Sequence, residues 1–138
     1  MNILVIGSGA REHAIVRTLD QSPKNKEIFC LGSNINPGIA ELCADLKVAN
    51  INDTHTIASY AKKKAIDLAI VGPENPLAVG VADVLCDRDV RVVGPKKNLA
   101  QIETSKAFTR DLLTEYNISG CPKYKTFSSL SGVAEFFG

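Results

Sequence analysis

Short apolar runs alternate with longer segments of helical period along most of this chain, a pattern typical of a parallel sheet covered by helices. The apolar runs predict five strands, at residues 3–6, 28–31, 47–49, 68–71 and 90–93. The segments between them predict four helices, at residues 10–20, 40–44, 53–65 and 77–85. The sequence therefore predicts an α/β fold with a doubly wound, mostly parallel, five-stranded Rossmann-like sheet.

The alternation of short apolar runs with helical segments ends near residue 100. Residues 105–116 predict an amphipathic helix, residues 124–127 a strand-like segment, and a further helix is expected from Leu130. We therefore expect two domains, the first over residues 1–102 and the start of a second over residues 103–138. We also expect this sequence to be part of a longer protein.

Composition and charge exclude several classes of partner. Sixteen Lys and Arg against fifteen Asp and Glu leave a formal net charge of +1, so no global field attracts nucleic acid or a membrane surface. The four cysteines are widely spaced and form no C-x-x-C pair, which predicts reduced thiols and no metal site. No apolar run approaches the length of a membrane span. We expect a cytoplasmic, monomeric protein that recognises a small molecule locally.

The first candidate site is the segment 7–13, G-S-G-A-R-E-H, where the first strand turns into the first helix. Backbone N–H groups and the positive end of a helix dipole favour a phosphate there. The alternative is that the glycines only permit a tight turn with close helix packing. The dinucleotide fingerprint would need a glycine in place of Glu12 and an acid after the second strand, and this chain has neither. For His13 a packing role is favoured over acid–base catalysis.

Two more loops are expected at the same edge of the sheet. Residues 34–38, N-I-N-P-G, offer side-chain amides after the second strand. Residues 72–76, G-P-E-N-P, offer Glu74 between two prolines that restrict the backbone after the fourth strand. Both loops suit the hydroxyl groups of a sugar. The alternative is an ordinary proline-rich turn in which Glu74 only caps the following helix.

Four short blocks, taken together, carry a family resemblance. They are G-S-G-A-R-E-H-A at residues 7–14, G-P-E-N-P-L at 72–77, Gly94-Pro95, and S-K-A-F at 105–108. In this order and spacing they resemble the phosphoribosylamine–glycine ligase family, also called glycinamide ribonucleotide synthetase. The resemblance spans essentially the whole chain.

The resemblance implies an ATP-grasp ligase of de novo purine biosynthesis. ATP would phosphorylate the carboxylate of glycine, and the amine of 5-phosphoribosylamine would attack the glycyl phosphate, with ADP and phosphate released. Mg²⁺ or Mn²⁺ would neutralise charge during phosphoryl transfer. This chain would be the N-terminal phosphoribosylamine-binding part with the first elements of the ATP-grasp domain. It would contain no catalytic residue and would be inactive alone.

The resemblance also implies which residues bind ligands. Phosphoribosylamine would contact three loops, at Gly9, Ala10, Arg11, Glu12, Asn36, Pro37, Gly38, Glu74, Pro76 and Leu77. Lys106 would approach the phosphates of ATP, and no metal ligand is expected. The chain departs from the family pattern at two places. Ala10 stands where the family usually has glycine, and the loop 32–38 stands where the family usually reads P-G-N-x-G. Because of the second departure, Asn34 and Asn36 both stay candidates for the asparagine that contacts the ligand. Two other functions remain open: a small nucleotide-binding sensing module and a fragment of an NAD-dependent dehydrogenase.

Overall fold

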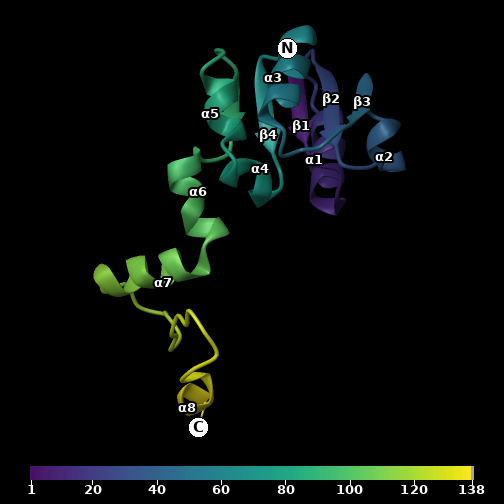
Figure 1. The fold of residues 1–138 in the computed structure, drawn as a ribbon. Helices are drawn as coiled ribbons and strands as arrows, with labels where there is room; N and C mark the ends of the chain where they lie inside the picture. Colours follow the sequence, from purple (N-terminus) through teal and green to yellow (C-terminus); the bar gives the residue numbers. More distant parts are fainter. Residues whose placement is uncertain (138) are drawn as a thin grey trace. The chain divides into compact units, whose positions relative to one another are not determined.

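The computed structural model describes residues 1–137, which divide into two compact units, Met1–Ala100 and a second from Gln101 onward. The first unit contains a five-stranded sheet in the order β3-β2-β1-β4-β5. Its strands are β1 Asn2–Ile6, β2 Glu27–Gly32, β3 Asp45–Val48, β4 Leu68–Val71 and β5 Arg91–Val93. Figure 1 labels β1 to β4 of this sheet. Every neighbouring pair is parallel, which confirms the predicted fold class.

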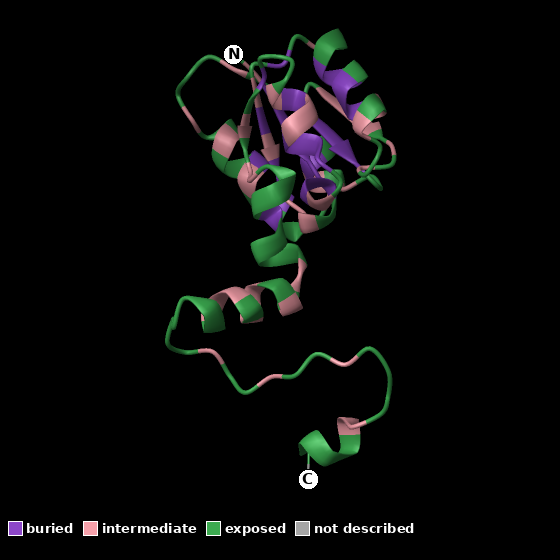
Figure 2. Cartoon of the chain, turned by 60° about the vertical axis from the view of Figure 1, so that its left-hand side comes forward, coloured by how far each residue is buried: buried purple, intermediate pink, exposed green. Residues whose placement is uncertain are grey.

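Helices cover both faces of this sheet. They are α1 Ala10–Asp20, α2 Pro37–Ala40, α3 Thr54–Lys63, α4 Glu74–Ala78 and α5 Val81–Cys86. Side chains alternate along β1, so that Leu4 and Ile6 pack with α3, α4 and α5 while Val5 packs with α1 and α2. Buried residues gather on the strands and the helices of this unit (Figure 2). Each fully buried aliphatic side chain contributes about 1.5–3 kcal/mol.

Three helix predictions in the first unit were wrong in their limits. The helix expected at residues 40–44 lies at Pro37–Ala40, because the Asn36 side chain accepts the N–H groups that begin it. The third helix ends at Lys63 rather than 65, and Ala65 has a left-handed φ of 47° and is exposed. The single helix expected at 77–85 is two, because Gly80 with φ of 93° interrupts it.

The elements that follow β5 also differ from the prediction. A helix that we did not predict, α6 Lys97–Thr104, precedes α7 Lys106–Glu115. Ser105 and Tyr116, expected as the ends of this helix, lie at its caps. Residues 124–127 form no strand, and α8 Val133–Phe137 begins three residues after Leu130. Within residues 1–137, no helix is both long and apolar enough to cross a membrane.

Candidate functional site

Three loops come together at the point in the sheet where the chain stops adding strands on one side of β1 and begins to add them on the other. The chain runs outward from β1 through β2 to β3, then returns to place β4 on the other side of β1. The N–H of Gly7 donates to the Leu31 carbonyl at 2.9 Å, and that of Gly72 donates to the Ile6 carbonyl at 3.0 Å. The carboxyl ends of β1, β2 and β4 therefore bring their loops together, in the position where doubly wound sheets bind ligands.

A buried carboxylate, that of Glu12, fills the space between two of these loops. Glu12 lies in the first turn of α1, is 3% exposed, and accepts the Gly9 N–H on Oε2 at 2.6 Å. A Cβ added at Gly7, Gly9 or Gly72 would lie 2.8, 2.9 or 2.1 Å from an atom of this side chain. The glycines of both motifs therefore make room for Glu12 itself.

The Glu12 carboxylate bears on the predicted binding of a phosphate at the N-terminus of α1. The N–H of Gly9, one of the predicted phosphate donors, is already bonded to Glu12. The N–H groups of Ala10 and Arg11 belong to the first helical turn, which has no intrahelical acceptors. A phosphate bound here would share the helix N-terminus with an existing negative charge, and its binding stays a prediction.

Arg11 lies between two carboxylates from different loops. Its Nη2 is 3.8 Å from Oε2 of Glu74, and its Nε is 4.0 Å from Oε1 of Glu12. Glu74 begins α4 behind Pro73. The side chains of Arg11 and Glu74 are 68% and 46% exposed, so both can reach a ligand. Glu74 thus pairs with a neighbouring loop, beyond any effect on its own helix.

The second loop is tied to the first by asparagines. Asn36 accepts from the N–H groups of Gly38 and Ile39, at 3.1 and 3.4 Å, and so begins α2. Its Nδ2 donates to the Ser8 carbonyl at 3.1 Å. The hydroxyl of Ser8 in turn donates to Oδ1 of Asn34. Sequence reasoning missed Ser8, whose place in the first motif is the only signal of this role.

His13 packs against the same loop. A Cβ at Gly38 would lie 2.4 Å from Cε1 of the His13 ring, so the glycine makes room for the imidazole. This contact supports the packing role favoured from the sequence. It also gives Gly38 a structural function beside its predicted role in ligand binding.

Cys30 lies beneath the first loop and is a structural thiol. Its Sγ donates to the Gly7 carbonyl at 3.2 Å. Burial, with smaller contributions from Cys43 and Glu12, raises the pKa of the Cys30 thiol to about 12. All four cysteines are free, as predicted. The thiol of Cys30 therefore stays protonated at neutral pH and is no nucleophile.

The remaining predicted residues lie in different surroundings. The side chains of Pro76 and Leu77 are buried, so any ligand contact there would involve their backbone. Ala10 and Pro37 are exposed, each at the start of a helix. Lys106 is exposed at the start of α7 in the second unit, and its approach to ATP stays a prediction.

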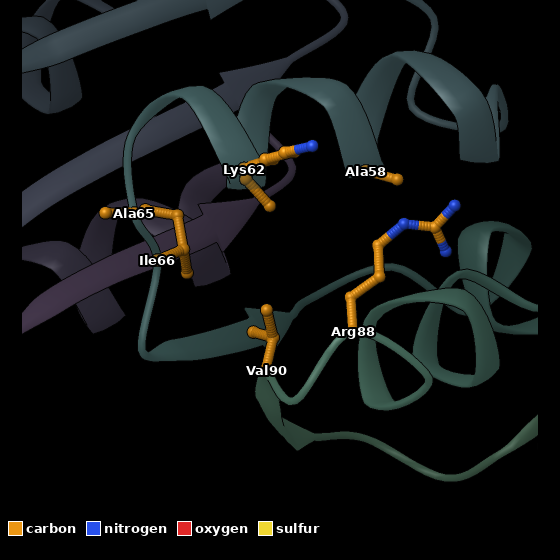
Figure 3. Close-up of a pocket in the computed structure, with 7 residues that line it drawn as sticks. Ala58, Lys62, Ala65, Ile66, Arg88 and Val90 are labelled. Carbon is orange, nitrogen blue, oxygen red and sulfur yellow. The ribbon is translucent and has the colours of Figure 1, made fainter.

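A pocket of about 380 Å³ lies at the opposite edge of the sheet (Figure 3). It is lined by Ala58, Ala61, Lys62, Ala65, Ile66, Arg88 and Val90. Ile66 and Val90 come shortly before β4 and β5, so this pocket faces the amino ends of the strands. It contains none of the predicted site residues.

Comparison with known proteins identifies the family. Residues 1–103 match the family described as phosphoribosylglycinamide synthetase, N domain. A phosphoribosylamine–glycine ligase of Methanococcoides burtonii is 43% identical over 136 residues, which cover 99% of this chain and 32% of the relative. The corresponding protein of Methanocaldococcus jannaschii is 44% identical over 137 residues, with 99% and 31% covered. The chain thus spans about a third of the length of the curated relatives that it matches.

Solved structures support the fold. N5-carboxyaminoimidazole synthetase from Staphylococcus aureus, in complex with ADP, aligns with a TM-score of 0.74 at 12% sequence identity. The alignment covers 99% of this chain and 35% of that protein. Since the family match extends over most of the chain and includes all three loops, the chain belongs to the phosphoribosylglycinamide synthetase N-domain family.

Proposed function

We propose that this chain is the phosphoribosylamine-binding part of an ATP-dependent ligase that joins glycine to 5-phosphoribosylamine. The observation that carries the proposal is the family match over residues 1–103, which contains the three loops at the carboxyl ends of β1, β2 and β4. The named relatives are phosphoribosylamine–glycine ligases. The ligand would lie where the exposed groups of Arg11 and Glu74 face one another.

The residues of this site suit a polar sugar. The carboxylate of Glu74 accepts hydrogen bonds, so it would hold ribose hydroxyl groups or the amine of the substrate. The guanidinium of Arg11 and the free N–H groups of the first turn of α1 would attract the phosphate. By fixing the amine, these groups would direct the nucleophile toward the glycyl phosphate, whose formation from ATP belongs to the complete ligase.

ATP and Mg²⁺ are expected to depend mainly on residues outside the described part. In residues 1–137 no group of three or more His, Cys, Asp or Glu side chains could hold a metal ion. We assign the described residues no step through the metal. We expect Lys106 to contact the ATP phosphates in the complete ligase and this chain alone to be inactive.

The two alternative functions are less well supported. A dehydrogenase would need space for a dinucleotide pyrophosphate at the first loop, where Glu12 lies. A sensing module would bind a nucleotide without joining substrates, whereas the matched relatives are named as ligases. The family match favours the ligase over both.

A single substitution at Glu74 tests the proposal. In the complete natural polypeptide, Glu74→Gln should raise the KM for phosphoribosylamine by about 10- to 150-fold, the equivalent of about 1.5–3 kcal/mol for a hydrogen bond to a charged group. The KM values for ATP and glycine should be unchanged. Glu27→Gln, an exposed glutamate at the opposite end of the sheet, is the matched control. Equal losses for all three substrates would instead indicate damage to the scaffold and would contradict the proposal.

A further inference from the structure

Among the residues that the structure describes, one oxygen of Glu12 has no hydrogen-bond partner. Oε2 accepts from Gly9, but Oε1 is buried and unpaired among the described residues. Buried carboxylate oxygens are costly without a donor, so an unpaired one in a native fold calls for a physical explanation. Neither the capping of α1 nor the filling of the space between the loops requires this second oxygen to be charged.

Arg11 is the cation close to that oxygen. Its Nε is 4.0 Å from Oε1 of Glu12, longer than the roughly 2.7–2.9 Å of a charge-assisted hydrogen bond. Its Nη2 is similarly long, at 3.8 Å, from Oε2 of Glu74. The guanidinium therefore lies between two carboxylates and is bonded closely to neither. Because the Arg11 side chain is 68% exposed, it has room to move toward either one.

The two carboxylates attract Arg11 differently. Glu74 is half-exposed, so water screens its charge and competes for its oxygens. Glu12 is buried, where attraction to a cation is stronger and the unpaired oxygen gains most from a donor. A ligand that occupies Glu74 would remove one attraction and leave the other.

We propose that Glu12 is a positioning residue that acts through Arg11, an inference that rests on the function proposed above. When hydroxyl or amine donors of phosphoribosylamine occupy the carboxylate of Glu74, Arg11 moves onto Oε1 of Glu12. That shift pairs the buried oxygen and holds the guanidinium beside the ligand, with its remaining N–H groups directed to it. The role requires the negative charge of Glu12, whereas capping and space-filling require only its shape.

Glu12→Gln separates these two roles, because glutamine keeps the shape and an acceptor for Gly9 but loses the charge. The first test follows the Arg11 Nε–Hε signal by NMR in the 138-residue chain during titration with ribose 5-phosphate. We expect this signal to shift and its hydrogen exchange to slow on binding, and Glu12→Gln to abolish both effects. Arg17→Ala, an exposed arginine farther along α1, should leave them unchanged.

The outcomes of this titration are distinct. Two outcomes would overturn this inference and leave the proposed function intact. In the first, the loop amides shift but the Arg11 signal does not. In the second, the Arg11 signal moves equally in Glu12→Gln and in the unchanged chain. No shift of any loop amide would contradict the proposed function, and the inference would fail with it.

A double-mutant cycle in the complete ligase provides the second test. Glu12→Gln and Arg11→Ala should each raise the KM for phosphoribosylamine by about tenfold, and the double variant should show about the same tenfold loss. The KM for ATP should not change. Losses that multiply to about a hundredfold would mean that Glu12 does not act through Arg11. If Glu12→Gln fails to fold, Arg11→Lys replaces it: retention of the wild-type KM would overturn the proposal, since a lysine cannot bond Oε1 as the guanidinium Nε does.

Discussion

Gly72→Ala should strongly destabilise the first unit, although it adds only one methyl group. The backbone of Gly72 does not have the positive φ that only glycine adopts readily, so alanine is not excluded by conformation. The added Cβ would instead lie 2.1 Å from Oε1, 2.6 Å from Cδ and 2.7 Å from Cγ of Glu12. These contacts are too short by about 1 Å, so the carboxylate must move out of its place between the loops.

The size of the effect follows from two contributions. Overpacking a filled site costs about 1–3 kcal/mol, and loss of the Gly9 N–H hydrogen bond to a charged acceptor costs about 1.5–3 kcal/mol. The free energy of unfolding should therefore fall by about 2.5–6 kcal/mol, a large part of the roughly 5–15 kcal/mol of a typical domain. Urea denaturation of the 138-residue chain, followed by circular dichroism, measures this directly.

The Glu12→Ala background provides the control. Without the Glu12 side chain the new methyl group has space, so Gly72→Ala should cost less than about 1 kcal/mol in that background. An equal cost in both backgrounds would refute the reasoning, because the loss would then not depend on Glu12.

Three further changes test other contacts of the site. Gly38→Ala should displace the His13 ring and cost about 1–3 kcal/mol in urea denaturation, and His13→Ala should relieve that cost. Asn36→Ala should cost about 1–2 kcal/mol by removing the cap of α2, whereas Asn36→Ser should keep a cap acceptor and recover part of that cost while losing the Nδ2 bond to the Ser8 carbonyl. Burial raises the pKa of Cys30 to about 12 and that of Cys43 to about 11, so the folded chain keeps protons that the unfolded chain loses above pH 9. The contribution of these two thiols to stability should therefore be constant below pH 9 and fall above it, by about 1.4 kcal/mol per pH unit for Cys30 up to about pH 12, and urea denaturation of Cys30→Ala should lack that share.

The elements with local signals were predicted well. The helix at Ala10–Asp20 and the strand at Leu68–Val71 have the limits that the sequence indicated. Each is bounded by a glycine, and the helix has a clear helical period while the strand is an unbroken apolar run. The parallel order of the strands also follows from the alternation of strand and helix, because each return to the sheet requires a crossover.

One of the errors arose where the structure depends on a distant residue. The first turn of α6 is supported by Asp83 of α5, whose carboxylate accepts the N–H of Lys97 at 2.8 Å. A cap supplied from fourteen positions away leaves no local signal. Gly80 could equally have been tolerated inside one helix, and only its left-handed conformation divides α4 from α5.

The motif residues were found from the sequence, but the reason for their glycines was not. Spacing alone placed Gly9 and Glu12 at the start of one helix and Gly72 after another strand. It could not show that the Glu12 side chain lies against Gly72 as well as Gly9, because the contact with Gly72 depends on the pairing of β1 with β4. The sequence predicted that these glycines let a ligand approach the backbone, which stays a prediction, and the structure shows that they also make room for the Glu12 carboxylate.

The position of Glu12 also explains why this loop should not accept a dinucleotide. In the G-x-G-x-x-G fingerprint the third glycine allows close packing of helix and strand, and the pyrophosphate lies on the helix N-terminus. Here Glu12 occupies the third position, and its carboxylate is 2.6 Å from the N–H that a pyrophosphate would need. A pyrophosphate bound to the Gly9 N–H would meet both a filled space and a like charge. The single phosphate of the proposed ligand would instead lie at the Arg11 guanidinium and the N–H groups of Ala10 and Arg11. The same fold therefore presents, beside Glu12, the exposed pair of Arg11 and Glu74, which suits a smaller ligand carrying hydrogen-bond donors.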